Sequence, residues 1–272
     1  MGLAGPALAD LAGVWRRSLL VDGDGGRDTT SAVTWVQGPA GYADLRQPAG
    51  LSRPSGTRGL GDLSFGQLLG LAGQEAFAGR LRHADGAFHW GRTVDHRPPA
   101  PLPDAGRLEW RGPVLVEEGL YAPYVEHWHP VEDAGGLCAA AELVDPHSGR
   151  AGLLVRAGSW FGYARDRSEP LPAHASLTEL VAGAADAVRA RELLDCEVSL
   201  GRITGGHWTI ERSTLPHREG RTLAPALTGG DDGFSVSDTG PDGTATPRRW
   251  EIAAAEGPLH LLATTRGSAA GG

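Results

Sequence analysis

Residues Gly13–Pro48 read GVWRRSLLVDGDGGRDTTSAVTWVQGPAGYADLRQP and contain the pattern that decides the fold. Apolar, β-branched and aromatic residues form three short runs, and the glycines between the first two supply the positive φ angles of a hairpin turn. In the third run the two-residue period of a strand puts Tyr42, Asp44 and Arg46 on one face. The stretch therefore predicts an antiparallel meander with one polar and aromatic face.

Trp15 stands near the start of the first run. A buried tryptophan removes about 200 Å² of surface from water. That area is sufficient to close one end of a small barrel, and we expect Trp15 to do so while Arg16 and Arg17 stay paired or in contact with water.

The remaining sequence continues this pattern over 272 residues with 41 glycines and 19 prolines, which separate short apolar runs as in turn-rich β structure. An Asp85-Gly86 turn between two alternating segments predicts a hairpin. Two helices interrupt the strands, one within residues 62–77 that starts at Asp62 or Ser64, and one over residues 176–194 with a capping box formed by Ser176 and Glu179.

Comparison of the two halves indicates an internal repeat. Phe88-His-Trp-Gly-Arg92 aligns with Trp208-Thr-Ile-Glu-Arg212, and a proline follows each segment. We predict a mainly β fold of two tandem antiparallel lipocalin-like barrels, each with a short helix. The first covers residues 1–134 and the second residues 135–272, with a flexible segment at about 227–247.

Composition excludes several classes of protein. All 25 basic residues are arginine, so chemistry that needs a lysine amine is excluded. The net charge of −8 opposes binding to nucleic acid. Cys138 and Cys196 are too few for a disulfide framework, which favours a reducing cytoplasm, and no run has the length of a membrane helix. We expect a cytoplasmic protein that binds neither nucleic acid nor membrane.

Several segments together resemble a known family. Gly13-Val-Trp15 resembles the G-x-W signature of lipocalin and calycin barrels. The wider pattern is similar to the HRI-type protein family, whose members resemble two lipocalin-type barrels in one chain, and it covers most of residues 10–225. The segments that carry it are Asp28-Thr-Thr30, Val33–Gln37, Tyr42–Arg46, Phe88-x-Trp-x-Arg92-x-x-Asp95, Tyr124-x-Glu-x-Trp128 and Leu194–Arg202. The resemblance implies a fold but no reaction.

Four charged residues form the candidate site, namely Asp44, Arg46, Arg92 and Glu126. If the polar strand faces turn inward, these side chains meet inside the first barrel, where burial and neighbouring charges perturb the pKa of a carboxylate. We assign catalysis to Glu126, Asp44 and Arg92. The expected ligand-binding residues are aromatic except for one arginine: Tyr42, Arg46, Trp90, Tyr124, Trp128 and Trp35. The structural alternative is an Arg–carboxylate network that sets strand register.

Two further groups suggest chemistry but have simpler explanations. His127 and His129, with His89 and His96 upstream, have the residue type of a metal site. However, His127 and His129 share the strand face opposite Glu126, so we expect them to point outward and predict no metal. In the second half, Asp195, Glu197 and Ser199 with His207 and Ser213 allow a Ser/His/acid triad to be drawn, but no Gly-x-Ser-x-Gly elbow accompanies them.

The function expected from these residues is the binding of a small, partly hydrophobic molecule in the first barrel, with cofactor-independent acid/base chemistry of a lyase, isomerase or cyclase type. The alternatives are a non-catalytic carrier and a protein-interaction scaffold. The expected partner is the small molecule itself, and a homodimer is left open.

Overall fold

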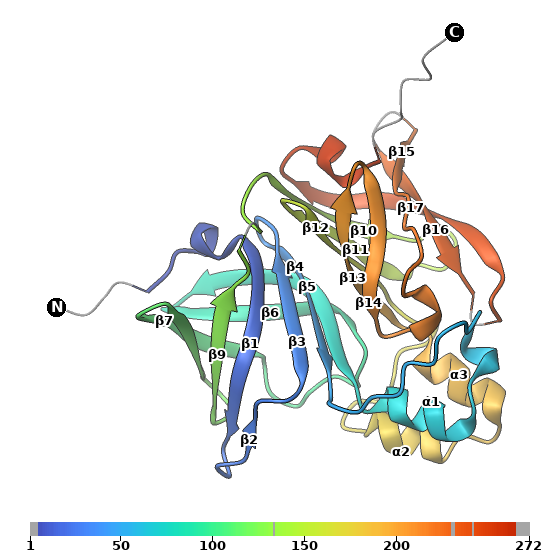
Figure 1. Ribbon diagram of the computed structural model, residues 1–272, viewed down its shortest axis with the longest axis horizontal. Coiled ribbons are helices and arrows are strands. Elements are labelled where there is room, and N and C mark those ends of the chain that lie inside the picture. The colour runs from blue at the N-terminus through green and yellow to red at the C-terminus, as the bar shows by residue number, and fades with distance from the viewer. Residues whose placement is uncertain (1–4, 133, 230–231, 241, 265–272) are drawn as a thin grey trace, which may run out of the picture.

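The computed structural model describes residues 5–132, 134–229, 232–240 and 242–264. The chain forms two antiparallel sheets in tandem, each strongly curled, as Figure 1 shows. The first half contributes strands β1 (Gly13–Asp22), β2 (Arg27–Asp28), β3 (Ala32–Gln37), β4 (Gly41–Gln47), β5 (Glu75–Ala84), β6 (Ala87–Asp95), β7 (Ala105–Arg111), β8 (Val114–Gly119) and β9 (Tyr124–Pro130). β2 pairs beside β1, and from β1 through β3 to β9 the strands follow the chain order. β9 also pairs with β1, which closes the first barrel.

The second half forms a curled sheet with strand order β14-β13-β12-β11-β10-β17-β16-β15. A segment around Leu223 spans the space between the outer strands: its N–H donates to the carbonyl of Trp208 at 3.0 Å, and its carbonyl accepts from Ser237 N at 2.9 Å. The strands are β10 (Cys138–Val144), β11 (Ala151–Ala157), β12 (Trp160–Arg165), β13 (Glu197–Thr204), β14 (His207–Ser213), β15 (Ala226–Thr228), β16 (Gly233–Thr239) and β17 (Ala245–Glu256). The mainly β fold with two tandem barrels is therefore confirmed.

The two sheets repeat one arrangement of strands. In each half the last strand pairs back onto the first, and helices are inserted after the third long strand. Each half also carries a bulge at a glycine. A Cβ on Gly79 would lie 2.0 Å from the carbonyl oxygen of Gly91, and one on Gly201 would lie 2.1 Å from that of Thr209, so neither position accepts a side chain.

The bulges correct the sequence alignment of the repeats. Gly79 pairs with Arg92, and Gly201 pairs with Ile210. Arg92 therefore corresponds to Ile210, and Arg212 corresponds to Val94, two residues away from the alignment that the aromatic pattern predicts. That alignment was wrong because it matched aromatic residues without the register of the neighbouring strand.

The helices are shorter than expected. Helix α1 (Phe65–Ala72) begins at Ser64, which forms a capping box with Gln67, and ends at Gly73. The expected helix over residues 176–194 is instead two helices, α2 (Leu177–Ala182) and α3 (Ala187–Leu194). Gly183 ends α2, and the side chain of Asp186 caps α3 by accepting from Arg189 N at 2.8 Å.

The 3-10 helices are η1 (Leu8–Leu11), η2 (Leu60–Asp62), η3 (Pro216–Arg218) and η4 (Leu259–Leu262). Within the described residues, no helix has the length and apolar character needed to cross a membrane.

Most of the described residues in the segment expected to be flexible, 227–247, belong to strands. They form the end of β15, all of β16 and the start of β17. Asp238 is buried, whereas Ser235 and Ser237 lie on the outer face of β16. Phe234 and Val236 alternate with these serines and are buried in the second barrel. Residues 230, 231 and 241, which also fall in this expectation, lie outside the described part.

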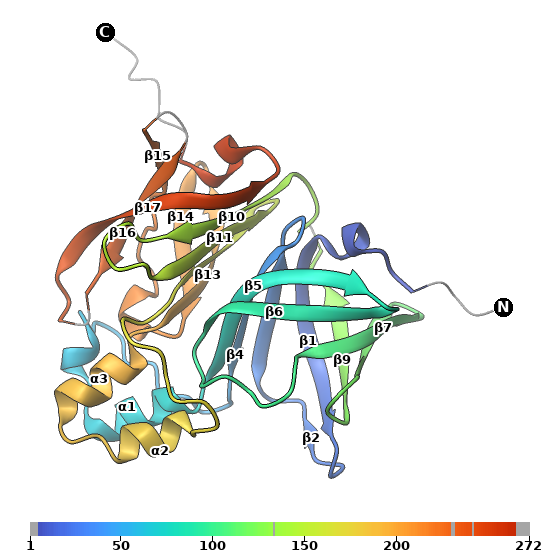
Figure 2. The same ribbon diagram turned by 180° about the vertical axis from the view of Figure 1, so that it is seen from behind.

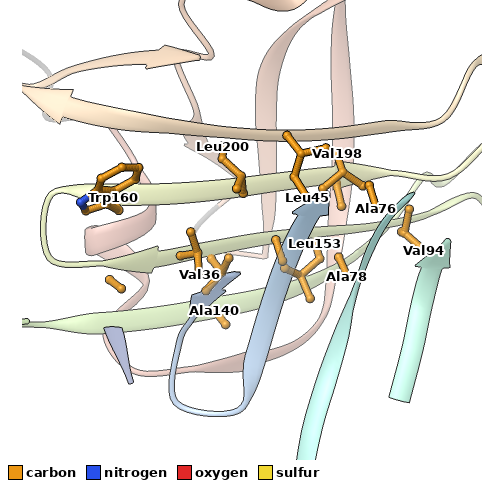
Figure 3. Packing of buried hydrophobic residues seen from close by; sticks show 14 of the residues in the cluster. Val36, Leu45, Ala76, Ala78, Val94, Ala140, Leu153, Trp160, Val198 and Leu200 are labelled. Atoms are coloured by element: carbon orange, nitrogen blue, oxygen red, sulfur yellow. The ribbon is translucent and has the colours of Figure 1, made fainter. Parts of the chain in front are cut away.

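The two barrels pack face to face through a shared apolar layer. Val36 and Leu45 of the first barrel contact a cluster that includes Leu153, Val198 and Leu200 of the second, as Figure 3 shows. The chain passes from one sheet to the other between β9 and β10, and one core spans both sheets. Burial of this layer therefore couples the stability of the two halves.

The three helices lie together at one end of the molecule, beside both barrels, in Figure 2. Leucines of α1, with Val181 of α2 and Leu194 of α3, form an apolar cluster of their own. This arrangement gives each inserted segment a hydrophobic face to bury and fixes the strand ends from which the helices emerge.

Candidate functional site

A pocket of about 490 Å³ opens at the end of the first barrel near β2, at the lower end of Figure 1. Its wall is mainly charged and comes from strands that are far apart in the sequence. The lining residues are Arg17, Leu20, Asp22, Asp28, Ser31, Arg46, Pro48, Gly73, Glu75, Arg92, Arg97, Asp104, Ala122, Pro123, Tyr124 and Glu126.

The other end of the barrel is closed by Trp15, as expected. Its indole N–H donates to the carbonyl of Leu11 in η1 at 2.8 Å, and its ring stacks on Trp35 at 5.9 Å between centroids. The first barrel thus has one sealed apolar end and one open polar end.

Arg46 joins the two carboxylates that the sequence assigned to catalysis. Its guanidinium donates to Asp44 at 3.1 and 3.2 Å and to Oε1 of Glu126 at 3.0 Å. Arg17, across the barrel, donates to the same Glu126 oxygen at 2.6 Å and to Asp28 at 2.6 Å. The side chains of Arg17 and Glu126 are almost completely buried, so these ion pairs act in a medium of low dielectric constant.

Arg92 belongs to a neighbouring group in the same pocket. Its guanidinium lies 3.6 Å above the ring of Phe77 and donates to Asp95 at 3.0 Å and to Asp104 at 2.7 Å. Simple alternation along β6 predicts that Asp95 faces away from Arg92. The extra residue Thr93 in the bulge reverses that phase and brings both side chains to one face.

The aromatic residues assigned to ligand binding lie mostly behind the pocket. Trp35 makes edge contacts with Trp90 and Trp128 at centroid distances of 6.1 and 5.6 Å, and Tyr42 contacts Phe77 at 6.0 Å. These rings fill the barrel. Of the nine predicted site residues, those that line the pocket are Arg46, Arg92, Tyr124 and Glu126, whereas those placed behind it are Asp44, Tyr42, Trp35, Trp90 and Trp128.

Glu117 is a central residue that the sequence analysis missed. Its carboxyl accepts from the Tyr124 hydroxyl at 2.7 Å and from the Trp128 indole at 2.9 Å, and it faces Glu126 across the β8–β9 pair. Burial, together with the charge of Glu126, raises the pKa of Glu117 to about 8. The available signal was the two-residue period that puts Glu117 on the same strand face as Leu115, but Val116 and Glu118 on the other face did not show which carboxylate points inward.

Asp44 also has a perturbed pKa. Burial raises its pKa to about 6, although Arg46 opposes that change. Asp44 does not reach the pocket, so it acts on Arg46 rather than on a bound molecule. Arg17, which the sequence analysis placed among paired or hydrated residues, is the second missed member of the site.

Two buried polar atoms of the pocket residues have no hydrogen-bond partner in the part of the chain that the structure describes, Oε2 of Glu126 and Nε of Arg92. Oε2 of Glu126 is buried and makes no hydrogen bond, whereas Oε1 accepts from two arginines. The pocket arginines all have carboxylate partners, since Arg17, Arg46, Arg92 and Arg97 each form ion pairs. The free carboxylate oxygen suits a ligand group that donates a hydrogen bond, whereas the free donor is one N–H of an arginine that Asp95 and Asp104 already hold.

The histidines do not gather at this site. The ring of His129 lies 2.9 Å from the hydroxyl of exposed Ser18, and His96 is buried against the carbonyl of Leu71 at 3.2 Å. Burial and the nearby Arg167 lower the pKa of His96 to about 3. Across the part of the chain that the structure describes, no group of three or more metal-ligating side chains occurs.

The triad drawn in the second barrel does not form. Ser199 donates to Glu197 at 2.7 Å and contacts Ser213 at 2.9 Å. His207 is exposed at the far end of the β13–β14 hairpin, paired with Thr204. The residue types were suggestive, but the strand register separates the histidine from the serine. That hypothesis was wrong.

Comparisons with known proteins give a fold and no activity. No protein-family model matches the sequence. No curated protein matches it either. Among solved structures, the chain is similar to uncharacterized protein YLR301w from Saccharomyces cerevisiae, with a TM-score of 0.54 and 13% identity over 90% of this chain and 98% of the other. At that identity the likeness shows the fold alone, and its coverage includes both barrels.

Proposed function

We propose that the protein binds a small polar molecule in the open end of the first barrel, with a hydrogen-bond donor of that molecule placed on Oε2 of Glu126. The observation that carries the proposal is this buried acceptor without a partner at the wall of a pocket of about 490 Å³. A buried carboxylate oxygen is costly to leave unpaired, and an amine, amide or hydroxyl of a ligand would pair it.

The charges of the pocket favour a cationic or neutral donor over an anion. The alternative is an anionic or carbonyl group held by Arg46 or Arg92. Both guanidinium groups are already bound by carboxylates, and an anion would have to compete with these buried ion pairs. Glu126 offers its free oxygen without such competition.

The same atom suits acid/base chemistry. A carboxylate oxygen in contact with a bound molecule is placed to accept a proton, as a lyase, isomerase or cyclase step requires. We propose Glu126 as the base, with Arg46 and Arg17 holding its other oxygen and Tyr124 at the pocket wall. Asp44 is a positioning residue in this proposal, because it contacts Arg46.

The two alternatives have less support. A carrier of apolar ligands needs an empty apolar interior, and the aromatic rings around Trp35 fill the first barrel. A scaffold needs a broad exposed apolar surface. Several large apolar side chains are exposed, but they lie on separate segments: Phe65, Leu102, Tyr121, Leu137 and Val188.

Three further expectations remain proposals. We propose a cytoplasmic location, since Cys138 and Cys196 are both free thiols. Membership of the HRI-type family stays a hypothesis based on the motifs described above. Native mass spectrometry of the purified protein measures its oligomeric state and tests whether it forms a homodimer.

The test compares Glu126→Gln with Glu132→Gln, which removes an exposed carboxylate from the loop after β9. Benzylamine, benzamide and benzoate serve as probes of one size and three charges in ligand-observed NMR. We expect benzylamine to bind the wild type best and Glu126→Gln to weaken it about tenfold, as loss of one charged hydrogen bond predicts. The Glu132→Gln variant keeps the wild-type affinity.

Native mass spectrometry of the freshly purified protein supplies a second reading, because a co-purifying small molecule identifies the ligand class directly. The proposal fails if amine, amide and carboxylate probes bind the wild type and Glu126→Gln equally while both proteins are folded.

A further inference from the structure

A second pocket lies between the two barrels and shares Arg17 and Ser31 with the wall of the first pocket. It encloses about 280 Å³ and takes its walls from β1 and β3 on one side and from β12, β13 and β14 on the other. The lining residues are Arg16, Arg17, Ser31, Ala32, Val33, Thr34, Trp160, Leu200, Glu211 and Arg212.

Arg212 crosses from the second barrel to the first and binds only neutral acceptors there. It donates to Oε1 of Gln47 at 2.9 Å, to the hydroxyl of Thr34 at 3.2 Å and to the carbonyl of Ala32 at 2.5 Å. Within the described residues, no carboxylate lies within ion-pair distance of it. A guanidinium has five N–H groups, so two remain for another partner.

The environment of Arg212 increases its need for an anion. Burial, with the charge of nearby Arg53, lowers the pKa of Arg212 to about 10, which still leaves it a cation at neutral pH. A part-buried cation without a counter-ion is costly, and a bound anion would offset that cost.

Trp160 supplies an independent sign of a missing acceptor. Its ring lines the pocket with 6% of the side chain exposed, and its indole N–H is buried without a hydrogen-bond partner. Figure 3 shows the nitrogen on the side of the ring away from the labelled aliphatic side chains. The guanidinium of Arg202 stacks on this ring at 4.4 Å and holds it in place.

The internal repeat shows that the fold does not require an arginine here. The strand register matches Arg212 with Val94 of the first barrel, which is completely buried in the apolar layer between the barrels. The second copy places a charge where the first has an aliphatic side chain, and that charge faces a pocket.

We propose that the pocket between the barrels binds an organic anion, in which a carboxylate or phosphate group accepts from Arg212 and Trp160 while an apolar or aromatic portion lies against Val33 and Leu200. Exposed Arg16 stands at the pocket wall and adds a second positive charge, and Glu211 is the one acidic residue among those that line it. Because the walls come from both halves, the ligand contacts both barrels at once.

Isothermal titration calorimetry with benzoate, phenyl phosphate and benzamide tests this site. We expect at least one anion to bind about tenfold more tightly than neutral benzamide, and the stronger of the two anions identifies the group that the site prefers. Arg212→Gln reduces the affinity for that anion about tenfold. Trp160→Phe keeps the ring and removes the N–H, so it reduces affinity several-fold.

Two controls isolate the site. Arg107→Gln removes an exposed arginine of β7 outside the pocket and leaves anion binding unchanged. Glu109→Gln removes an exposed carboxylate of the same strand, outside both pockets, and also leaves it unchanged. If Arg212→Gln fails to fold by circular dichroism, Arg16→Gln and Trp160→Phe carry the test. Equal binding of benzamide and both anions, or full anion affinity in the folded Arg212→Gln variant, would overturn the proposal.

Discussion

Replacement of Glu117 by glutamine is predicted to stabilise the protein at neutral and alkaline pH. The side chain is 3% exposed and lies opposite Glu126, so its charged form is disfavoured in the fold. Glutamine has nearly the same shape and retains both hydrogen bonds, because its oxygen accepts from Trp128 and its amide donates to the Tyr124 oxygen.

The magnitude follows from the raised pKa of Glu117, from 4.5 to about 8. Between these values the folded state holds a proton that the unfolded chain has lost. The free energy of unfolding of the wild type therefore falls as pH rises through this window, by at most about 1.4 kcal/mol per pH unit and about 5 kcal/mol in all. Below pH 4.5 both states are protonated, so this contribution is absent and glutamine offers no gain there.

Urea unfolding followed by tryptophan fluorescence at pH 5, 6.5 and 8 measures the difference between the two proteins. The control is Glu118→Gln, one residue further along β8, where the carboxylate is exposed and paired with Arg111. We expect the advantage of Glu117→Gln over wild type to grow with pH and that of Glu118→Gln to stay flat. A pH-independent difference for Glu117→Gln would refute the reasoning that burial holds this carboxyl in its neutral form.

Two further substitutions test the barrel itself by thermal and urea unfolding. Gly79→Ala pushes a methyl group to 2.0 Å from the Gly91 carbonyl oxygen and should abolish the bulge, with a loss of several kcal/mol in the free energy of unfolding. The control Gly70→Ala in α1 meets no atom within 4 Å and raises the free energy of unfolding by about 1 kcal/mol. Equal effects of the two substitutions would contradict the assigned bulge. Arg46→Met leaves two buried carboxylates without their shared cation and costs about 3–5 kcal/mol at pH 8, and a loss below 1 kcal/mol would show that these groups are not held as ions.

The fold could be predicted largely from local sequence. The Asp85-Gly86 turn is a clear case: both residues have positive φ angles, 53° and 72°, as a two-residue hairpin requires, and strands of alternating character flank them. Ser64, one of the two residues predicted to start α1, caps the helix for equally local reasons. Turn and capping chemistry depends on neighbours within a few residues, so the sequence contains it.

The site was harder to predict because it depends on strand register. The period of two placed Arg46 correctly beside Asp44, but it failed beyond Thr93, where one extra residue reverses the phase of β6. Whether Glu117 or Glu118 points inward is decided by pairing with β9, seven or more residues away. The Arg212 site was inaccessible for a further reason, since its partners Gln47 and Thr34 belong to the other barrel.

The internal repeat also separates a structural ion pair from a site. Arg46 lies opposite Glu75 in the β4–β5 register, and Glu75 is four residues before the bulge glycine of the first barrel. Arg165 lies opposite Glu197 in the same position of the second barrel. Arg165 is 1% exposed and binds Asp195 at 2.8 Å, so a buried arginine with carboxylate partners is a feature of the repeated fold. Such a cluster alone is therefore weak evidence of function. An unbound carboxylate oxygen does not separate the two, because Oε2 of Glu197 lacks a partner as Oε2 of Glu126 does. What distinguishes the first barrel is that its cluster forms the wall of an open pocket.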